Sequence, residues 1–225
     1  MRGYLHSKRD KLLYKEPEFY KYTWFLIGLL ILVYLFEIFY LQETLKNYMT
    51  FSTDVFTLEY FYTLFTSIFL HLNLSHLVSN LIALYFFGRL VEKHLGVGVV
   101  FAFVFGGVFA NIVSSIISYL IGDLFYSLGA SGGIAGLIML AILLEPFRIT
   151  TFLGWFLIYL DVVGLRKVST TNHLAHLGGY MALVFLFFFL NFRDRQKLIR
   201  GLIINLVFIF AFMYLIYFTP VMSLF

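Results

Sequence analysis

The sequence predicts an all-α fold: a polytopic membrane bundle of seven transmembrane helices with the N-terminus inside. Of the 225 residues, 61% are hydrophobic and only 12% are charged, whereas soluble domains are about half apolar. The mean hydropathy is +0.91, and the apolar residues form runs near the ~20 residues that cross a bilayer. The charged residues cluster between these runs, so the sequence predicts no separate soluble domain.

Seven apolar runs have spanning length, and each is expected to form one helix. They lie at residues 22–40, 74–91, 97–121, 128–144, 149–163, 173–192 and 202–218. The fifth run is the weakest, because it is short and carries Asp161 near its end. No repeat or linker interrupts the chain, so we expect one membrane domain over residues 1–225. Its expected parts are a cytoplasmic segment at 1–21, a six-span core at 22–192, and an inner loop with the seventh span at 193–225.

Basic residues set the expected orientation. Of the 16 Lys and Arg residues, only Lys46, Arg166 and Lys167 fall in outer segments when the N-terminus is placed inside. This asymmetry follows the positive-inside rule of membrane proteins. Basic inner loops also account for the pI of about 9.2, so no nucleic-acid partner is expected. The first outer loop, residues 41–70, is rich in Phe and Tyr and is expected to lie in the membrane interface as short amphipathic pieces.

Polar residues on three different spans are expected at a similar depth. Because a helix rises about 1.5 Å per residue, Ser131, His76 and His176 each lie about 20 Å above the inner boundary. Asn80 lies one turn below His76 on the same helix face. Polar groups in lipid need partners and usually face the bundle interior. We therefore expect these side chains to converge roughly 10 Å below the outer surface.

Two short motifs carry the serine and one of the histidines. They are Gly129-Ala130-Ser131-Gly132 and Ala175-His176-Leu177-Gly178-Gly179. Their small residues let helix backbones touch, and a serine beside a histidine supplies a nucleophile and its base. Either motif alone could be a packing motif, but the pair at matched depth favours a hydrolytic site.

Metal and cofactor chemistry finds little support in the sequence. His173 and His176 could begin a metal site, but there is no His-Glu-x-x-His motif and no carboxylate is expected at their depth. The sequence therefore predicts no metal and no cofactor. The absence of cysteine excludes disulfides, iron–sulfur clusters and cysteine catalysis.

The motifs resemble those of the rhomboid intramembrane serine proteases. That family has G-x-S-G at the start of its fourth span, A-H-x-x-G on its sixth, and H-x-x-x-x-H-x-x-x-N entering its second. The chain repeats this order and spacing, with His71, His76 and Asn80 forming the third motif. The match covers the first six spans, and the seventh corresponds to the extra C-terminal helix of some members.

The resemblance implies a dyad of Ser131 and His176 with no third acidic residue. His176 would take the Ser131 proton and return it to the leaving amine. The backbone N–H of Ser131 and the side chains of His76 and Asn80 would hold the oxyanion. The supporting positions are Gly129, Gly132, Gly179, His71 and Glu92, of which His71 and Glu92 are expected to be structural hydrogen-bonding residues.

Several features depart from common family patterns, including one in the first loop and one after the serine. The first loop often carries E-x-W-R, whereas this chain reads Glu59-Tyr60-Phe61-Tyr62. Bacterial members often have a Tyr four residues after the serine, and here that position is Ala135. These changes affect loop anchoring and histidine placement and leave the reacting groups intact.

The expected activity is cleavage of transmembrane helices of other proteins near the extracytoplasmic side, through an acyl-enzyme. The expected partners are transmembrane protein substrates and the lipid bilayer, in a multi-pass protein of a prokaryotic plasma membrane; the oligomeric state stays open. The alternative is a non-catalytic rhomboid-like protein that binds and steers membrane clients, but intact Ser131 and His176 favour the enzyme. A transporter would have charged or broken helices near the midplane, where these spans are nearly free of ionisable residues.

Overall fold

Helices make up most of the regular structure in the computed structural model. It describes residues 19–41, 51–52, 60–121, 126–146, 148–164 and 173–191, with isolated positions between 194 and 206. The elements are α2 (Lys21–Phe39), β1 (Phe51–Ser52), α4 (Thr63–Thr66), the 3-10 helix η3 (Ser67–Phe69), α5 (Leu74–Leu95), α6 (Gly98–Ile121), β2 (Tyr126–Ser127), α7 (Ser131–Leu144), α8 (Ile149–Gly164) and α9 (His173–Asn191). Most of the predicted seventh span and most of the N-terminal segment lie outside the described residues.

The all-α membrane class is confirmed, and the first six predicted spans are all helices. By length and composition, α2, α5, α6 and α9 can cross a membrane, whereas α7 and α8 are shorter apolar helices. Helix α7 begins later than its apolar run, at Ser131. The reason is local: Gly129 has a φ of +129°, which an α-helix does not accommodate.

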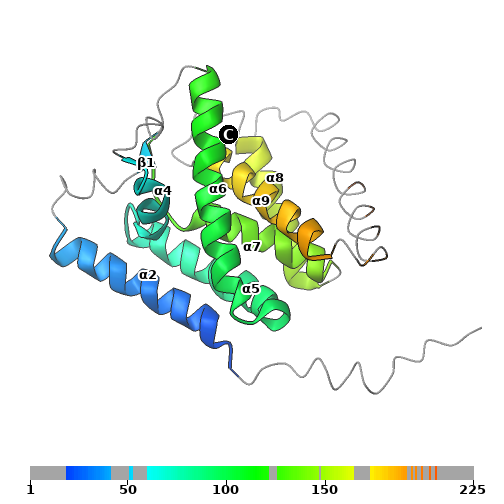
Figure 1. Cartoon of the computed structure of the whole chain (residues 1–225). Coiled ribbons are helices and arrows are strands. Elements are labelled where there is room, and N and C mark those ends of the chain that lie inside the picture. Colours follow the sequence, from blue (N-terminus) through cyan, green and yellow to red (C-terminus); the bar gives the residue numbers. More distant parts are fainter. Residues whose placement is uncertain are drawn as a thin grey trace, which may run out of the picture.

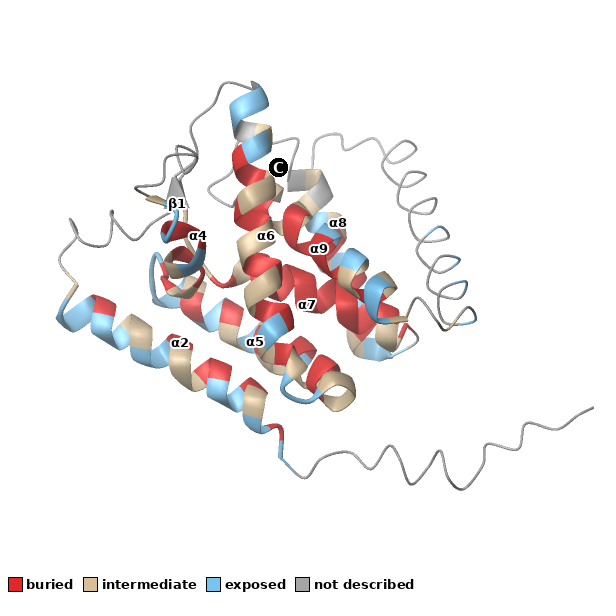
Figure 2. Cartoon of the chain, in the orientation of Figure 1, coloured by how far each residue is buried: buried red, intermediate tan, exposed pale blue. Residues whose placement is uncertain are grey.

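Helix α7 is the centre of the bundle. Every residue from Gly132 to Leu143 is buried, and α5, α6 and α9 all pack against it. Figure 2 shows this buried helix between partly exposed neighbours, while α2 along one edge alternates buried and exposed positions. Gly132, Gly133 and Gly136 each lie in close contact with α6 or α9, and small residues of this kind let neighbouring helices pack closely around α7.

Glycines allow α7 and α9 to cross in close contact. A Cβ built on Gly179 would collide with the carbonyl oxygen of Gly132, and one built on Gly136 would lie 2.5 Å from Leu183 Cδ2. Small residues at such a crossing let the two backbones touch. Figure 1 shows α9 lying across α7 with α6 beside both helices.

Glu92, near the end of α5, holds the start of α2. Its Oε1 accepts a hydrogen bond from the Tyr22 backbone N–H at 3.0 Å. Its Oε2 accepts from the Thr23 backbone N–H at 2.7 Å and from the Thr23 hydroxyl at 2.6 Å. The unpaired N–H groups at a helix start favour a carboxylate. These bonds agree with the structural role predicted for Glu92.

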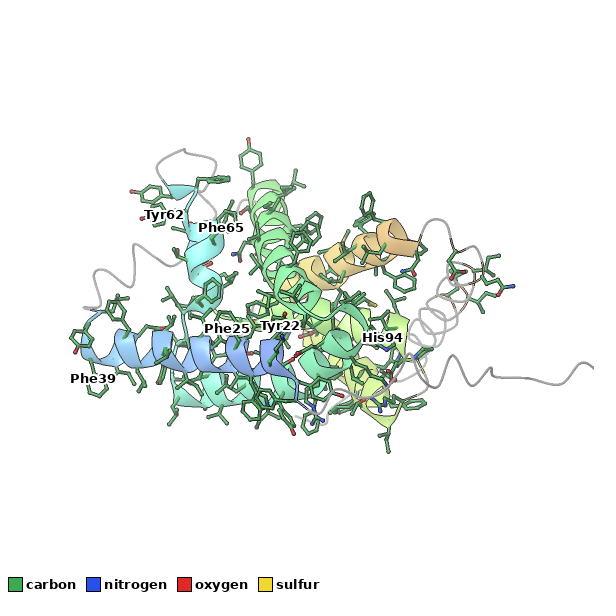
Figure 3. The ribbon with its side chains drawn as sticks, turned by 60° about the horizontal axis from the view of Figure 1, so that its bottom comes forward. Tyr22, Phe25, Phe39, Tyr62, Phe65 and His94 are labelled. Carbon is green, nitrogen blue, oxygen red and sulfur yellow. The ribbon has the colours of Figure 1, made fainter. Side chains whose placement is uncertain are left out.

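A second polar cluster forms at the same end of the bundle, around Glu145. Its Oε1 lies 2.8 Å from His94 Nε2 and 3.1 Å from Lys93 Nζ, and its Oε2 lies 3.0 Å from Arg148 Nε. Burial disfavours the charged carboxylate, but the hydrogen bonds of His94 and Lys93 and the charges of Arg148 and Lys93 outweigh burial and keep the pKa of Glu145 below its usual value. Figure 3 shows His94 on the Tyr22 side of α2, far from Phe39.

Residues 60–69 of the first outer loop form short helical pieces. Asn111 of α6 anchors them, because its Nδ2 donates to the Leu64 carbonyl and the Ser67 hydroxyl, both at 3.0 Å. Leu64 is buried, whereas Tyr62 and Phe65 on the same segment are exposed. Figure 3 shows both aromatic side chains on this segment.

Candidate functional site

Ser131 is the first residue of α7 and follows a turn that only glycine fits well. At Gly129, φ is +129°, and its N–H donates to the Ser67 carbonyl at 2.9 Å. A Cβ on Gly129 would lie 2.7 Å from His76 Cε1, so the His76 ring rests directly on this turn. The unpaired N–H groups at the start of α7 favour negative charge next to Ser131.

His76 and Asn80 lie one turn apart near the start of α5. The side chain of Asn73 caps this helix, accepting a hydrogen bond from the His76 backbone N–H at 2.9 Å. Asn80 is 6% exposed, and its Nδ2 has no hydrogen-bond partner among the described residues. An unpaired buried donor costs about 1–3 kcal/mol. This amide is therefore a candidate to donate a hydrogen bond to an oxygen atom of a bound substrate.

His71 supports His76 from the loop before α5. Its side chain is fully buried, and the two imidazole centroids are 5.3 Å apart. The His71 backbone N–H donates to Glu37 Oε1 at 3.0 Å, and His71 Nδ1 lies 3.2 Å from the Phe69 carbonyl. These contacts fit the structural role expected for His71.

Asp161 of α8 lies against His176, at the start of α9. The distance from Asp161 Oδ1 to His176 Nδ1 is 2.8 Å, and the same oxygen lies 2.9 Å from His173 Nδ1. Tyr180, one turn below His176, donates its hydroxyl to Asp161 Oδ2 at 2.5 Å. The prediction that no carboxylate lies at the depth of these histidines is therefore wrong.

The physical reason is the antiparallel arrangement of two consecutive helices. Asp161 sits in the last turn of α8 and His173 begins α9, so both residues lie at the same end of the bundle. One signal could have identified this contact: an ionisable residue inside an apolar span usually has a partner and a function. From the sequence alone, Asp161 only makes the fifth run a weak candidate for a span.

The crossing of α7 and α9 brings the neighbours of Ser131 and His176 together. Gly132 faces both Gly179 and the carbonyl oxygen of Ala175. Because His176 uses Nδ1 for Asp161, Nε2 is the ring nitrogen that can accept a proton. Near the start of α7, Gly132 thus lies close to Ala175 and Gly179, and Gly129 lies against the His76 ring, whereas Glu92 lies at the far end of α5.

The cluster around Asp161 also has the composition of a metal site. Asp161, His173 and His176 each offer one ligand atom, and these atoms all lie within 4.8 Å of one another. Two histidines and a carboxylate suit zinc, and the Tyr180 hydroxyl would support the carboxylate as an outer donor. A metal ion would occupy Nδ1 of His176, so metal binding and orientation of a base by Asp161 are mutually exclusive.

The fold and these residues define a class of protein: a polytopic helical membrane protein with a serine and histidines gathered at one end of its bundle. The family model for the Rhomboid domain matches residues 58–191, which is more than half of the chain. The chain therefore belongs to the rhomboid family. One segment of 55 residues is 40% identical to RHOMBOID-like protein 12, mitochondrial, of Arabidopsis thaliana. That segment covers 24% of this chain and 16% of the relative.

Proposed function

We propose that this rhomboid is an intramembrane serine endopeptidase that cuts transmembrane helices of other membrane proteins near their extracytoplasmic ends. The observation that carries the proposal is the α7–α9 crossing, which brings the start of α7 at Ser131 to the start of α9 at His176. Membership of the family supports a site within the membrane. The presence of both Ser131 and His176 supports catalysis over client binding alone.

In the proposed first step, Ser131 Oγ attacks the scissile carbonyl and His176 Nε2 takes its proton. His176 then returns that proton to the leaving amine, and a water repeats the sequence to release the acyl group. This base needs the tautomer with hydrogen on Nδ1, and a carboxylate acceptor at that nitrogen selects it. Asp161 is therefore proposed as a positioning residue, which replaces the expected dyad with a Ser-His-Asp arrangement.

Tyr180 is proposed to hold the Asp161 carboxylate in place. Its hydroxyl bonds Asp161 Oδ2, while Oδ1 faces the imidazole of His176. Many family members place a Tyr four residues after the serine, where this chain has the buried Ala135. The Asp161–Tyr180 pair would provide the histidine placement that Ala135 does not supply.

The oxyanion of the tetrahedral intermediate is proposed to lie between the starts of α5 and α7. The Ser131 backbone N–H, the His76 ring and the Asn80 amide would donate to it. Asn80 Nδ2 is buried without a partner among the described residues, as expected for a donor reserved for developing charge. No metal ion is needed for any of these steps.

The proposed substrates are transmembrane helices that unwind easily near the site. A peptide bond inside a regular helix is shielded by its own turn, so Gly or Pro nearby should favour cutting. The close packing around Gly132 and Ala135 favours a small residue just before the cleaved bond. The host membrane expected from the sequence, a prokaryotic plasma membrane, stays a prediction, and the matched relative is named mitochondrial.

Labelling with a fluorophosphonate tests the nucleophile directly. We expect the wild-type protein in detergent to be labelled at Ser131, and the Ser131→Ala and His176→Ala variants to remain unlabelled. Ser79→Ala is the matched control, because Ser79 is an exposed serine of α5 that bonds the His76 carbonyl. Equal labelling of wild type and Ser131→Ala would reject the assignment. A wild-type protein that binds a model substrate without cutting it would favour the non-catalytic alternative.

The position of the cut tests the depth of the site. One cleavable sequence is moved in steps along a model transmembrane helix, and the products are identified by mass spectrometry. We expect cutting in the extracytoplasmic third, because the site lies roughly 10 Å below the outer surface. Cutting confined to the cytoplasmic third would contradict both the orientation and the site.

A further inference from the structure

A cationic pocket lies at the end of the bundle away from Ser131. It has a volume of about 250 Å³, and its polar lining comes from Tyr20, Arg89, Arg148 and Thr150. These residues belong to three parts of the chain: the approach to α2, the end of α5 and the start of α8. The volume is below the 300–1,000 Å³ typical of sites for drug-sized molecules. A compact charged group suits such a space.

Arg89 gives the pocket a positive charge with no ion-pair partner among the described residues. Its guanidinium carbon lies 4.5 Å from the Tyr20 ring centroid and 4.8 Å from that of Tyr85, and its Nη1 donates to the Tyr85 hydroxyl at 2.7 Å. Among the described residues, no carboxylate oxygen lies within ion-pair distance of Arg89, whereas Lys93 and Arg148 both pair with Glu145. A half-buried guanidinium fixed by two rings favours an anion.

The start of α8, which also lines the pocket, adds to this preference. Helix α8 begins at Ile149, so the positive end of its dipole lies at the pocket. Arg148, just before it, contributes a second guanidinium, whose Nε bonds Glu145. A phosphate group offers several strong acceptors, and the planar donor fork of Arg matches their geometry.

Apolar side chains flank the charged part of the pocket. Phe86 and Ile149 line it and are 43% and 85% exposed, as expected for residues that face lipid. The ligand would therefore have a charged head beside a hydrophobic body. The end of the bundle that holds the pocket is also the end predicted to be cytoplasmic, where basic pockets between helices bind anionic lipid head groups.

We propose that this pocket binds the phosphate group of an anionic phospholipid, with Arg89 as its principal contact. The acyl chains would run along Phe86 and Ile149. A bound head group would bridge α5, α8 and the approach to α2, so it would stabilise the bundle at the end remote from Ser131. The proposal does not depend on proteolytic activity.

Native mass spectrometry of the delipidated full-length protein, titrated with phosphatidylglycerol, tests the proposal. The wild-type protein should retain one lipid with clearly higher affinity than further copies. Arg89→Gln should weaken that site about tenfold to a hundredfold, as expected for loss of a charge-assisted contact. Arg89→Lys keeps the charge but loses the planar donor fork, so its affinity for the lipid should lie between those of wild type and Arg89→Gln. Lys21→Gln is the matched control: it removes one charge at the same end of the bundle, outside the pocket, and should bind as wild type does.

Thermal unfolding of the same proteins gives a second readout. Phosphatidylglycerol should raise the unfolding midpoint of wild type and Lys21→Gln, and phosphatidylcholine should not. If Arg89→Gln does not fold, the proposal is tested by the Arg89→Lys variant and by comparing phosphatidylglycerol with phosphatidylcholine on the wild-type protein. The site would be rejected if the wild-type protein bound phosphatidylcholine as tightly as phosphatidylglycerol. It would also be rejected if Lys21→Gln and Arg89→Gln lowered the affinity for phosphatidylglycerol equally. Stabilisation by millimolar inorganic phosphate that matches the lipid's would identify a free-anion site and overturn the lipid assignment.

Discussion

The Asp161 carboxylate lies 2.8 Å from Nδ1 of His176 and also accepts the Tyr180 hydroxyl. This contact joins α8 to α9. In serine hydrolases, a carboxylate in this position holds the imidazole in the tautomer whose other nitrogen accepts the serine proton. Conservative substitutions can separate this role from simple packing.

Asp161→Asn should lower turnover by about 10²–10⁴-fold, because general-base catalysis contributes about that much. The KM for a model transmembrane substrate should change little, since Asp161 acts through His176. Tyr180→Phe should cause a smaller loss, because it removes one hydrogen bond to the carboxylate and leaves the charge. Steady-state kinetics in detergent measures both. A packing role for Asp161 would instead appear as a lower unfolding midpoint with kcat and KM nearly unchanged.

The two histidines that share Asp161 Oδ1 should respond differently to truncation. His176→Ala should abolish cleavage and fluorophosphonate labelling, because it removes the proposed base. His173→Ala should keep substantial activity, since His173 lies about 4–5 Å nearer the surface on the same helix. Single-turnover cleavage assays on both variants provide the comparison. The opposite ranking would move the base to His173.

Removal of an oxyanion donor should act on turnover rather than on substrate binding. His76→Ala and Asn80→Ala are each expected to lower kcat by about 10²–10³-fold, the usual effect of losing one such donor. Substrate KM should stay within a few-fold of wild type, because these donors serve charge that develops in the transition state. Parallel losses in kcat and in substrate affinity would assign both residues to packing.

The Glu145 cluster should make stability depend on acid pH. Because its contacts lower the pKa of Glu145 in the folded state, the stabilisation is complete above the unfolded value near 4.5 and is lost as pH falls through the folded value. The unfolding midpoint of wild type should therefore fall between about pH 5 and pH 3. Glu145→Gln should be less stable than wild type at pH 7, and the difference should shrink at pH 3. A constant difference across this range would show that the ionised carboxylate is not the cause.

Metal ions should inhibit the enzyme rather than support it. EDTA and phenanthroline should leave cleavage unchanged, because the proposed steps need no metal. Micromolar zinc should inhibit, since Asp161, His173 and His176 can bind it and would then occupy Nδ1 of the base. His173→Ala should weaken this inhibition, and Arg89→Gln, at the other end of the bundle, should not. Activity lost on chelation and restored by zinc would support a catalytic metal.

The sequence alone determined the first six helices and the motifs on them. Apolar runs and glycine positions are local properties of the chain, so the bounds of α2, α5, α6, α8 and α9 differ from those predicted by only a few residues. Rise per residue also gave a common depth for Ser131, His76 and His176, because depth along a helix depends on spacing alone. The start of α7 lies three residues after the predicted one, because it depends on the turn at Gly129.

The tertiary structure decided which side chains meet. Three contacts join separate parts of the chain. Asp161 of α8 meets His176 of α9, and Glu145 after α7 meets Lys93 and His94 of α5. Arg89 of α5 lies over the ring of Tyr20, which precedes α2. Hydropathy gives the length of a helix and its depth in the bilayer but leaves its rotation about its own axis and its neighbours undetermined. Those follow from packing, above all from the close crossing of α7 and α9 at Gly132 and Gly179. Asp161 therefore resembled an ordinary helix end in the sequence and became a partner of His176 only when the helices packed.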